Sequence, residues 1–378
     1  MDLVLKESAT ITFHLASDTS EGVSLVASPL LEAVLSLHVV VNPKHHPLQQ
    51  PWARRAGRLN AGLRGEIEAF GFAYQSHIPE FCMPTERESA RSFKGELAAL
   101  ASTPDDLAAL EFSRCLVGDA SPRDPRLLRR AATMDAIWTA AQGMPRASRE
   151  LALLVLEEPQ ALMERFRVLL ASYWEEAFED EWARLQPVLV DGIHGAARVI
   201  AGSGLMAFLE GLRPDVRVNR QAGAFSLERG HDHEVRLAGD DILLMVPSVY
   251  VWPDVRVSCD APWHYGLVYP APAVVDKARS GIPPQELLKV IRALGDDTRL
   301  RVLRIVAEGP RSTQELASLA HVSEATMSKH LRILAEAGVL SSAREGYYVL
   351  YALVRERVAY LSAALTAFLT PGCAPRES

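Results

Sequence analysis

A short stretch near residue 325 carries side chains that could read DNA. Met327, Leu331 and Leu334 repeat with helical spacing, so they should form the buried side of a helix. Small polar and charged residues occupy the opposite face. Those predicted to contact base edges or the groove are Glu324, Ala325, Ser328 and Lys329. Side chains of this size let a helix enter the major groove, where they can hydrogen-bond to base edges.

Further polar residues of this region are predicted to bind the DNA backbone. They are Ser323, Thr326, Arg332 and Arg344. Arg344 lies near the tip of two alternating runs in residues 339–353, which are typical of a β-hairpin wing. A cation there would meet phosphates and make the affinity depend on salt. For each single residue, a solvated surface position with no role in binding remains the alternative.

The neighbouring elements are those that would position such a helix. Ser312 and Glu315 form a capping-box pattern that predicts the start of a preceding helix. A tight turn through His321 and Val322 leads to the helix 323–337, which should end at Gly338. Helix, turn, helix and wing in this order predict a winged helix-turn-helix in residues 285–370.

This region is similar to the winged helix of the ArsR family of bacterial transcriptional regulators. The similarity covers about Glu286 to Leu369 and includes ALGDDTRLRVLRIVAEGPRSTQELASLAHVSEATMSKHLRILAEAGVL. Membership implies a homodimer that commonly represses its own operon and is released by an inducer. The best-known members sense metals through cysteines in the third helix, but Ser312–Ala317 contains none. The last helix also lacks the histidine and carboxylate ligands of other members, so we expect neither a metal site nor a cofactor.

The first and last helices of this region each show an apolar stripe without a partner in so small a domain. We expect these stripes to form the dimer surface. Its predicted residues are Leu287, Leu288, Ile291, Leu361, Leu365 and Phe368.

Length and charge indicate that the upstream residues do a separate job. A chain of 378 residues should hold two or three domains. Its net charge of −7 is uneven: residues 283–378 hold 12 Lys and Arg against 10 Asp and Glu, whereas residues 1–282 hold 28 against 37. The four cysteines are scattered, and the amino terminus has neither a signal pattern nor an apolar run that could span a membrane. We therefore expect a cytoplasmic protein without disulfides, without a thiolate zinc site and without a membrane partner.

The upstream residues change from a helical to an alternating pattern. Thr10 to Leu15 alternates as a strand, and Ser28 to Val41 has helical spacing. Helices should continue to about Leu212, with a break near Pro187 and another at the glycines Gly202 and Gly204. Residues 214–272 contain short β-branched runs typical of a sheet, which the amino-terminal strand could join. The predicted fold is α+β: a helical region closed by a mostly antiparallel sheet, followed by the winged helix. The predicted divisions are 1–272, a linker at 273–284, the winged helix 285–370 and a tail 371–378.

The upstream sequence shows no phosphate-binding loop, no GxSxG and no HExxH, so we do not expect an enzyme. The run from His231 to Glu234 is interpreted as a polar turn in preference to a metal site. An aromatic group could form an effector pocket, although core packing is the more usual role of such residues. It consists of Tyr250, Trp252, Trp263, His264, Tyr265 and Tyr269.

The region resembles, more loosely, an uncharacterised domain that often precedes ArsR-type winged helices, through ASYWEEAFEDEWARLQP and LLMVPSVYVWPDV. The whole chain is predicted to be a homodimeric repressor that binds double-stranded operator DNA and is controlled through its upstream domain by an unknown signal, for which an unidentified small-molecule effector is one candidate. The alternative is that the upstream domain binds a protein or mediates dimerisation without an effector.

Overall fold

The computed structural model describes residues 10–15, 22–43, 46–75, 77–84, 92–118, 121–212, 216–228, 232–238, 240–251, 254–260, 262–281, 284–345, 348–354, 357–358, 361 and 365. It divides into two compact units. The upstream unit consists of Met1–Val41 and Pro51–Ala273, and the downstream unit of Asn42–Gln50 and Val274–Ser378.

The predicted linker at 273–284 is largely helical. Helix α11 covers Pro272–Gly281, and α12 begins at Pro284. Its residues AVVDKARS include alanine, lysine and arginine, which are good helix formers. The segment between the two predicted domains is therefore helical over most of its described length.

Helices make up most of the upstream unit before residue 213. They are α1 (Pro29–Val41), α2 (Gln50–Ala56), α3 (Ala61–Ala69), α4 (Phe93–Leu100), α5 (Asp105–Val117), α6 (Ala131–Gln142), α7 (Arg146–Glu157), α8 (Pro159–Tyr173), α9 (Glu179–Ser203) and α10 (Leu205–Glu210). A π-helical turn, Trp174–Phe178, joins α8 to α9. The predicted break near Pro187 is wrong, because α9 runs through this proline and keeps its other hydrogen bonds over 25 residues. No segment of the described helices could span a membrane.

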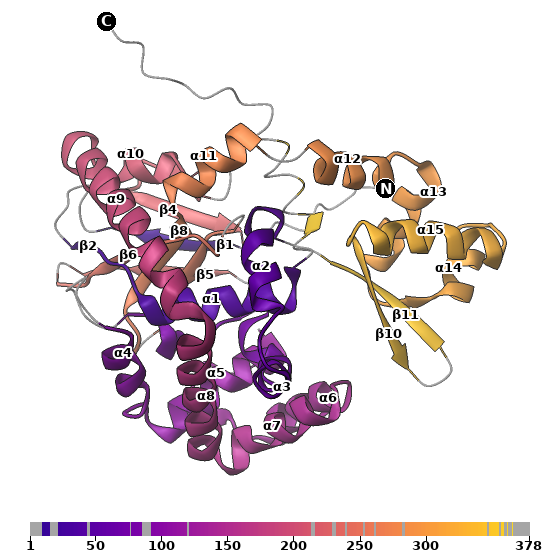
Figure 1. Ribbon diagram of the computed structural model, residues 1–378, viewed down its shortest axis with the longest axis horizontal. Helices are drawn as coiled ribbons and strands as arrows, with labels where there is room; N and C mark the ends of the chain where they lie inside the picture. Colours follow the sequence, from indigo (N-terminus) through magenta and orange to yellow (C-terminus); the bar gives the residue numbers. More distant parts are fainter. Residues whose placement is uncertain are drawn as a thin grey trace, which may run out of the picture. The chain divides into compact units, whose positions relative to one another are not determined.

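Two four-stranded sheets complete the upstream unit (Figure 1). The first has the order β3-β4-β1-β5, with β1 (Thr10–His14), β3 (Val216–Asn219), β4 (Ala224–Glu228) and β5 (His233–Arg236). The second has the order β2-β6-β8-β7, with β2 (Val23–Leu25), β6 (Leu243–Ser248), β7 (Arg256–Ser258) and β8 (Tyr265–Pro270). As predicted, the amino-terminal strand joins later strands: β1 pairs with β4 antiparallel and with β5 parallel.

The α+β class is confirmed, but the single, mostly antiparallel sheet is wrong. Each sheet mixes both directions, and β6 pairs in parallel with both β2 and β8. The reason lies in β6, where every residue is buried. Leu244 and Val246 belong to a core shared with the helices, whereas Leu243 and Met245 belong to a second core that includes β1. A strand buried on both faces carries a continuous apolar run, which is typical of parallel sheets.

The downstream unit has the predicted helix-turn-helix and wing. Its elements are α12 (Pro284–Leu294), α13 (Asp297–Val306), β9 (Arg311–Ser312), α14 (Thr313–Leu319), α15 (Glu324–Glu336), β10 (Leu340–Glu345) and β11 (Tyr348–Leu353). The strands form a sheet of order β10-β11-β9. Helix α13 buries Val302 and Val306, since the spacing of one helical turn aligns these two on one face. Leu300 on α13 and Leu319 on α14 are exposed.

Candidate nucleic-acid interface and upstream cavity

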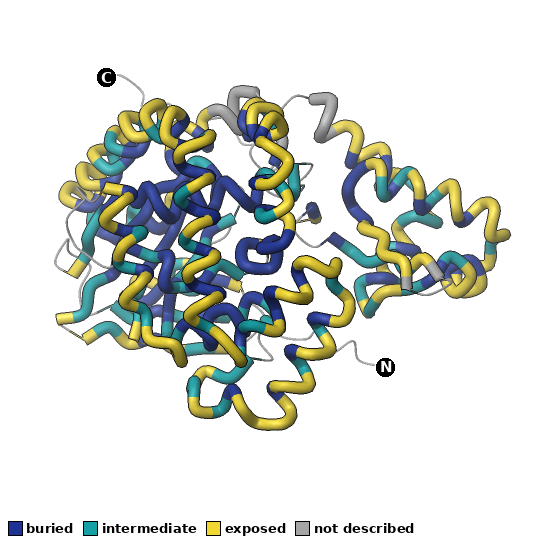
Figure 2. The backbone as a smooth tube through the Cα atoms, turned by 60° about the horizontal axis from the view of Figure 1, so that its bottom comes forward, coloured by how far each residue is buried: buried dark blue, intermediate teal, exposed yellow. Residues whose placement is uncertain are grey.

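Helix α15 turns its apolar residues inward and its polar residues outward. Met327, Leu331 and Leu334 are fully buried in the core of the downstream unit. Figure 2 shows the same division along its helices, with buried inner positions and exposed outer ones. All predicted DNA-contacting residues of this helix and its cap are exposed: Ser323, Glu324, Ala325, Thr326, Ser328, Lys329 and Arg332. The helix therefore presents one continuous polar face to solvent.

Two caps fix the start of α14 and of α15. At α14 the capping box forms as predicted: the Ser312 hydroxyl accepts from the Glu315 amide, and the Glu315 carboxylate accepts from the Ser312 amide at 2.8 Å. At α15 the Ser323 hydroxyl accepts from the Thr326 amide at 3.2 Å. Between the helices the chain turns at His321, whose φ is 55°. These local bonds set the direction in which α15 leaves the turn.

The carboxyl end of α15 stops at Gly338, as predicted. Gly338 has a φ of 72°, and its amide donates to the Ala335 carbonyl. The next amide, of Val339, donates to the Leu334 carbonyl. This pair of bonds is a Schellman motif, for which glycine is the favoured residue. The buried Arg357 adds a third contact, since its Nε donates to the Ala337 carbonyl at 3.1 Å.

The wing is the hairpin of β10 and β11. Their pairing runs from Leu340 opposite Leu353 to Glu345 opposite Tyr348. Arg344 is exposed and lies one pair before the end of this ladder, so it is near the tip as predicted. Gly346, which lies between the two strands in the sequence, is outside the described residues.

His330 packs at the edge of the buried side of α15. Its Nδ1 lies 3.6 Å from a carboxylate oxygen of Asp296, the residue that caps α13. The hydrogen bond from the Arg299 amide, together with the charges of Arg299 and His330, lowers the pKa of Asp296. The contact with Asp296 and the low exposure of its side chain indicate that His330 packs within the downstream unit.

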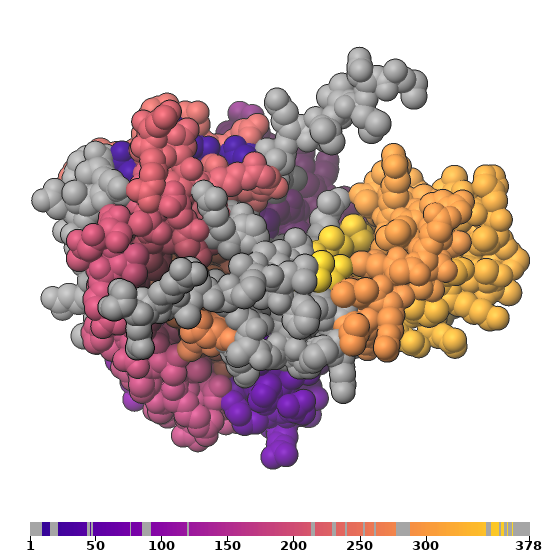
Figure 3. Space-filling view, turned by 90° about the horizontal axis from the view of Figure 1, so that it is seen from above, coloured from indigo at the N-terminus to yellow at the C-terminus, as the bar shows by residue number. Residues whose placement is uncertain are grey.

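Only some residues of the predicted dimer surface lie within the described part of the chain. Leu288 and Ile291 on α12 are 40% and 39% exposed, and Leu365 is 37% exposed. Leu361 is partly buried and packs on the core of the downstream unit. The side chain of Leu287 and the whole of Phe368 lie outside the described residues. Helix α12 is at the surface in the space-filling view (Figure 3), and these leucine and isoleucine side chains therefore meet solvent in a single copy of the chain.

Within the described residues, the aromatic group does not line one shared pocket. Tyr250 is buried in the helical core beside Trp52 and Phe178. Tyr269 is buried in the second core beside Phe208. Trp263 packs against the helical core and Tyr265 against the second core. His264 is in neither of these cores and does not line the cavity described below. Trp252 is outside the described residues. Tyr265 and Tyr269 lie on the same face of β8 and pack in the second core, whereas Tyr250 and Trp263 lie outside the strands and pack in the helical core.

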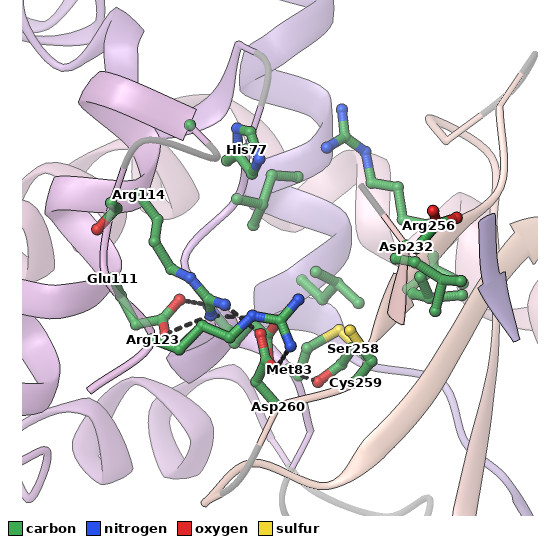
Figure 4. A pocket seen from close by; sticks show the side chains of 18 residues that line it. His77, Met83, Glu111, Arg114, Arg123, Asp232, Arg256, Ser258, Cys259 and Asp260 are labelled. Carbon is green, nitrogen blue, oxygen red and sulfur yellow. Dashed lines mark hydrogen bonds and ion pairs between the residues drawn. The ribbon is translucent and has the colours of Figure 1, made fainter. Parts of the chain in front are cut away.

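A cavity of about 490 Å³ lies elsewhere in the upstream unit, within the usual size range of small-molecule sites. Segments far apart in the sequence form its wall, including α5, the short helix Glu80–Cys82 and β7 (Figure 4). Its apolar part consists of Ile11, Leu31, Ile78, Met83, Val257 and Val268. Its charged part consists of Glu80, Glu111, Arg114, Arg123, Asp232, Arg256 and Asp260.

Arg114 is the centre of an ion-pair network at this wall. Its Nη1 lies 3.3 Å from Glu111 and 3.8 Å from Glu80, and its Nη2 donates to Asp260. Burial alone would lower the pKa of Arg114, but the charge of Glu111 and the bond to Asp260 raise it instead. Burial alone would raise the pKa of Asp260, but the hydrogen bond and charge of Arg114 lower it. This pair is therefore ionised at neutral pH.

Glu80 is in a different state. Burial, with repulsion from Glu111, raises the pKa of Glu80 to about 8, although a hydrogen bond from Ser258 and the charge of Arg114 oppose the shift. Burial also raises the pKa of Glu111, which accepts from the Glu80 amide at 2.9 Å and from the Trp263 indole at 3.1 Å. Glu80 therefore holds a proton at neutral pH, and one carboxyl of the cavity wall is neutral.

Three groups that could ligate a metal lie together at the cavity wall: Cys259 and Asp260, which line the cavity, and the neighbouring His233, with donor atoms within 4.8 Å of one another. Guanidinium groups already contact two of them. Arg123 Nη1 lies 2.6 Å from His233 Nδ1, and Arg114 donates to Asp260. Burial raises the pKa of Cys259 to about 12, so the thiol is protonated and is a weak ligand and nucleophile. The arrangement favours neither a cation nor thiolate catalysis.

Sequence reasoning missed this charged wall. One signal was present: Glu111 and Arg114 interrupt an otherwise apolar stretch of α5 at a spacing that places them on one face. Buried charges need partners, so such a pair indicates a polar site within the fold. Their partner Asp260 lies 146 residues further along the chain, and nothing local predicts that contact.

Comparison with known proteins gives two matches along the chain. Residues 9–274 match a family of unknown function, DUF5937. Residues 294–342 match a helix-turn-helix domain.

Curated relatives resemble the downstream region. The HTH-type transcriptional repressor SmtB of Mycobacterium tuberculosis is 35% identical over 83 residues, which cover 21% of this chain and 62% of the relative. The biofilm growth-associated repressor of Agrobacterium fabrum is 30% identical over 109 residues, which cover 29% of this chain and 86% of the relative. This chain thus spans less than two thirds of the length of SmtB. An ArsR-like transcriptional regulator from Rhodococcus sp. RHA1, of known structure, is 28% identical over 22% of this chain and 77% of its own, with a TM-score of 0.21.

Proposed function

Because the chain belongs to the DUF5937 family, whose function is unknown, and carries a winged helix-turn-helix of the ArsR type, we propose that it is a homodimeric DNA-binding transcriptional repressor controlled through its upstream unit. The relatives named as transcriptional repressors support the regulatory role. Their similarity lies in the part of the chain that would bind DNA.

The exposed face of α15 is the observation that carries this proposal. Glu324, Ala325, Ser328 and Lys329 would meet base edges in the major groove, and small side chains at the start of the helix allow the close approach. Ser323, Thr326, Arg332 and the wing residue Arg344 would hold the DNA backbone. Contacts to the DNA backbone position the protein, and contacts to base edges give sequence preference.

Dimerisation would place two such helices on one duplex. The exposed Leu288, Ile291 and Leu365 supply an apolar surface for a second copy. A two-fold dimer recognises two half-sites about one helical turn apart, roughly 34–36 Å. The expected operator is therefore a palindrome.

Control by a small molecule is supported by the cavity of the upstream unit. A ligand there alters DNA binding only if it prefers one of two states of the protein, with a typical coupling of about 1–3 kcal/mol. A protein partner is the second candidate for the controlling signal, because α6 exposes Met134 and Trp138 one turn apart, the latter by 58%. Large exposed aromatic residues are enriched in protein interfaces.

Sequencing of captured genomic fragments tests the proposal. The purified full chain is incubated with sheared genomic DNA of its source organism, and bound fragments are sequenced. The expected result is strong enrichment of a small number of fragments that share a motif, because specific binding exceeds non-specific binding by roughly 10³- to 10⁷-fold. Uniform recovery of the genome, or no recovery, would contradict the proposal.

A further inference from the structure

We propose that the cavity of the upstream unit binds a small organic carboxylate, which Arg123 holds through the edge of its guanidinium group formed by Nε and Nη2. The inference rests on the proposed function only in its consequence for DNA binding. Binding itself is a property of the upstream unit and can be measured without DNA.

The first observation is the unused donors of Arg123. Its side chain is 44% exposed and lines the cavity. Its contacts with described residues, to His233 and to Asp260 Oδ1 at 3.5 Å, all use Nη1. Nε and Nη2 therefore have no partner in the described part of the chain. These two N–H groups point in the same direction, a fork that matches the two oxygens of a carboxylate.

The second observation is the fixed position of this arginine. Its Nη1 can only donate, so His233 Nδ1 accepts at 2.6 Å. Asp260, which lies near the same Nη1, is in turn held by Arg114 (Figure 4). The guanidinium plane is thereby oriented before any ligand arrives, which reduces the entropy lost on binding. Arg114, in contrast, is surrounded by carboxyl groups from Glu80, Glu111 and Asp260. Its charge is therefore paired within the cavity wall.

The charge of the whole wall fits a monoanion better than a more highly charged group. Three arginines line the cavity together with four carboxyl groups. Glu80 carries a proton at neutral pH, since burial raises its pKa to about 8. The remaining charges are nearly balanced, so a single added negative charge on Arg123 is tolerated, whereas a phosphate dianion would lack compensation. The protonated Glu80 also avoids repulsion of the ligand.

The remainder of the cavity favours an organic ligand with an apolar body. Six apolar side chains line it, three of which, Ile11, Leu31 and Val268, are buried in the two cores of the upstream unit. A volume of about 490 Å³ accommodates more than an inorganic ion. A metal ion would compete with Arg114 and Arg123 for its ligands, and this makes Zn²⁺ the weaker candidate.

Isothermal titration calorimetry with matched probes tests the inference. The full chain is titrated at pH 7 with phenylacetate, phenylacetamide and phenethylamine, which share one apolar body, and with hexanoate, hexanamide and hexylamine. We expect at least one carboxylate to bind at least tenfold more tightly than its amide and amine. Tighter binding of an amine, of inorganic phosphate or of Zn²⁺, or no binding of either carboxylate, would overturn the proposed ligand class.

Variants locate the site. Arg123→Ala should weaken carboxylate binding by roughly 10- to 100-fold, because it removes a charge-assisted pair. Arg123→Lys keeps the charge but loses the fork and should show an intermediate loss, which covers the case in which the alanine variant does not fold. Arg146→Ala, an arginine that is 91% exposed on α7, should bind like the wild type. Unchanged binding by both folded Arg123 variants would overturn the assignment.

A final arm separates this inference from the proposed function. DNA affinity is measured on the most enriched genomic fragment with and without the bound carboxylate. A change in affinity supports control through this cavity. Carboxylate binding with unchanged DNA affinity would leave the site intact and contradict its role in control.

Discussion

The DNA-binding face and the cavity hold their polar groups in opposite ways. On α15 and the wing, the polar side chains come from residues 323–344 and are exposed. In the cavity wall they come from segments between residues 80 and 260, are partly or fully buried, and depend on one another for their ionisation. A surface of the first kind can change without loss of stability. A wall of the second kind couples ligand binding to the stability of the fold.

The largest expected effect concerns the dimer. Ile291→Glu should convert the dimer to a monomer, because a charge buried without a partner at an interface costs about 3 kcal/mol or more, roughly 100-fold in affinity. DNA affinity should fall with it. Native mass spectrometry and size-exclusion chromatography with light scattering give the mass. Lys289→Glu, also exposed on α12, is the matched control and should remain dimeric; an Ile291→Glu protein that stays dimeric removes α12 from the interface.

The second prediction separates two kinds of contact on the DNA-binding face. Lys329→Ala should reduce the preference for the specific duplex, since a contact to a base edge contributes about 1–3 kcal/mol of discrimination. Arg344→Ala should weaken binding to all duplexes alike and lower the salt dependence by about one phosphate contact. Competition binding against specific and scrambled duplexes at several salt concentrations measures both. Equal losses on both duplexes from both variants would reject this division of roles.

In the cavity wall, the raised pKa of Glu80 should make the stability of the upstream unit depend on pH. In the unfolded chain this carboxyl ionises near its ordinary pKa of 4.5, whereas in the folded unit its pKa is about 8. The unfolded state therefore binds fewer protons between these values, and the contribution of Glu80 to stability falls as the pH rises from about 4.5 to 8. The groups that face it are Glu111, Arg114, Ser258 and Asp260.

Glu80→Gln removes the cost of ionisation and should raise the melting temperature by several degrees at pH 8 but by little at pH 4.5. Thermal unfolding at the two pH values checks this, and DNA affinity should be unchanged in the absence of ligand. A variant that is equally stabilised at both pH values would show that ionisation of Glu80 is not the cause.

The smallest effect concerns the end of α15. Gly338→Ala should destabilise the downstream unit by about 1–2 kcal/mol, because a side chain disfavours the left-handed conformation that Gly338 adopts at a φ of 72°. Gly65→Ala in α3, where a new Cβ meets nothing within 4 Å, should instead stabilise by about 0.5–1 kcal/mol. Denaturant unfolding monitored by hydrogen exchange assigns each change to its unit. A neutral Gly338→Ala would contradict the strain argument.

The same contrast explains what could be predicted from the sequence. The capping box at Ser312, the stop at Gly338 and the alternating wing are signals within a few residues, and each has the expected geometry. The parallel pairing of β6 and the cavity wall depend on contacts between distant segments, such as Arg114 with Asp260. The described aromatic residues that were grouped in the sequence lie in two separate cores, Tyr250 and Trp263 in one and Tyr265 and Tyr269 in the other, and no local pattern predicts this division.

In vitro selection on randomised duplexes with the full chain tests whether a dimer reads DNA with α15. We expect an enriched palindrome whose half-sites are centred about one helical turn apart. Lys329→Ala should lose base preference in at least part of each half-site. No enriched sequence, or an enriched sequence without two-fold symmetry that Lys329→Ala leaves unchanged, would contradict the claim that a dimer reads DNA with α15.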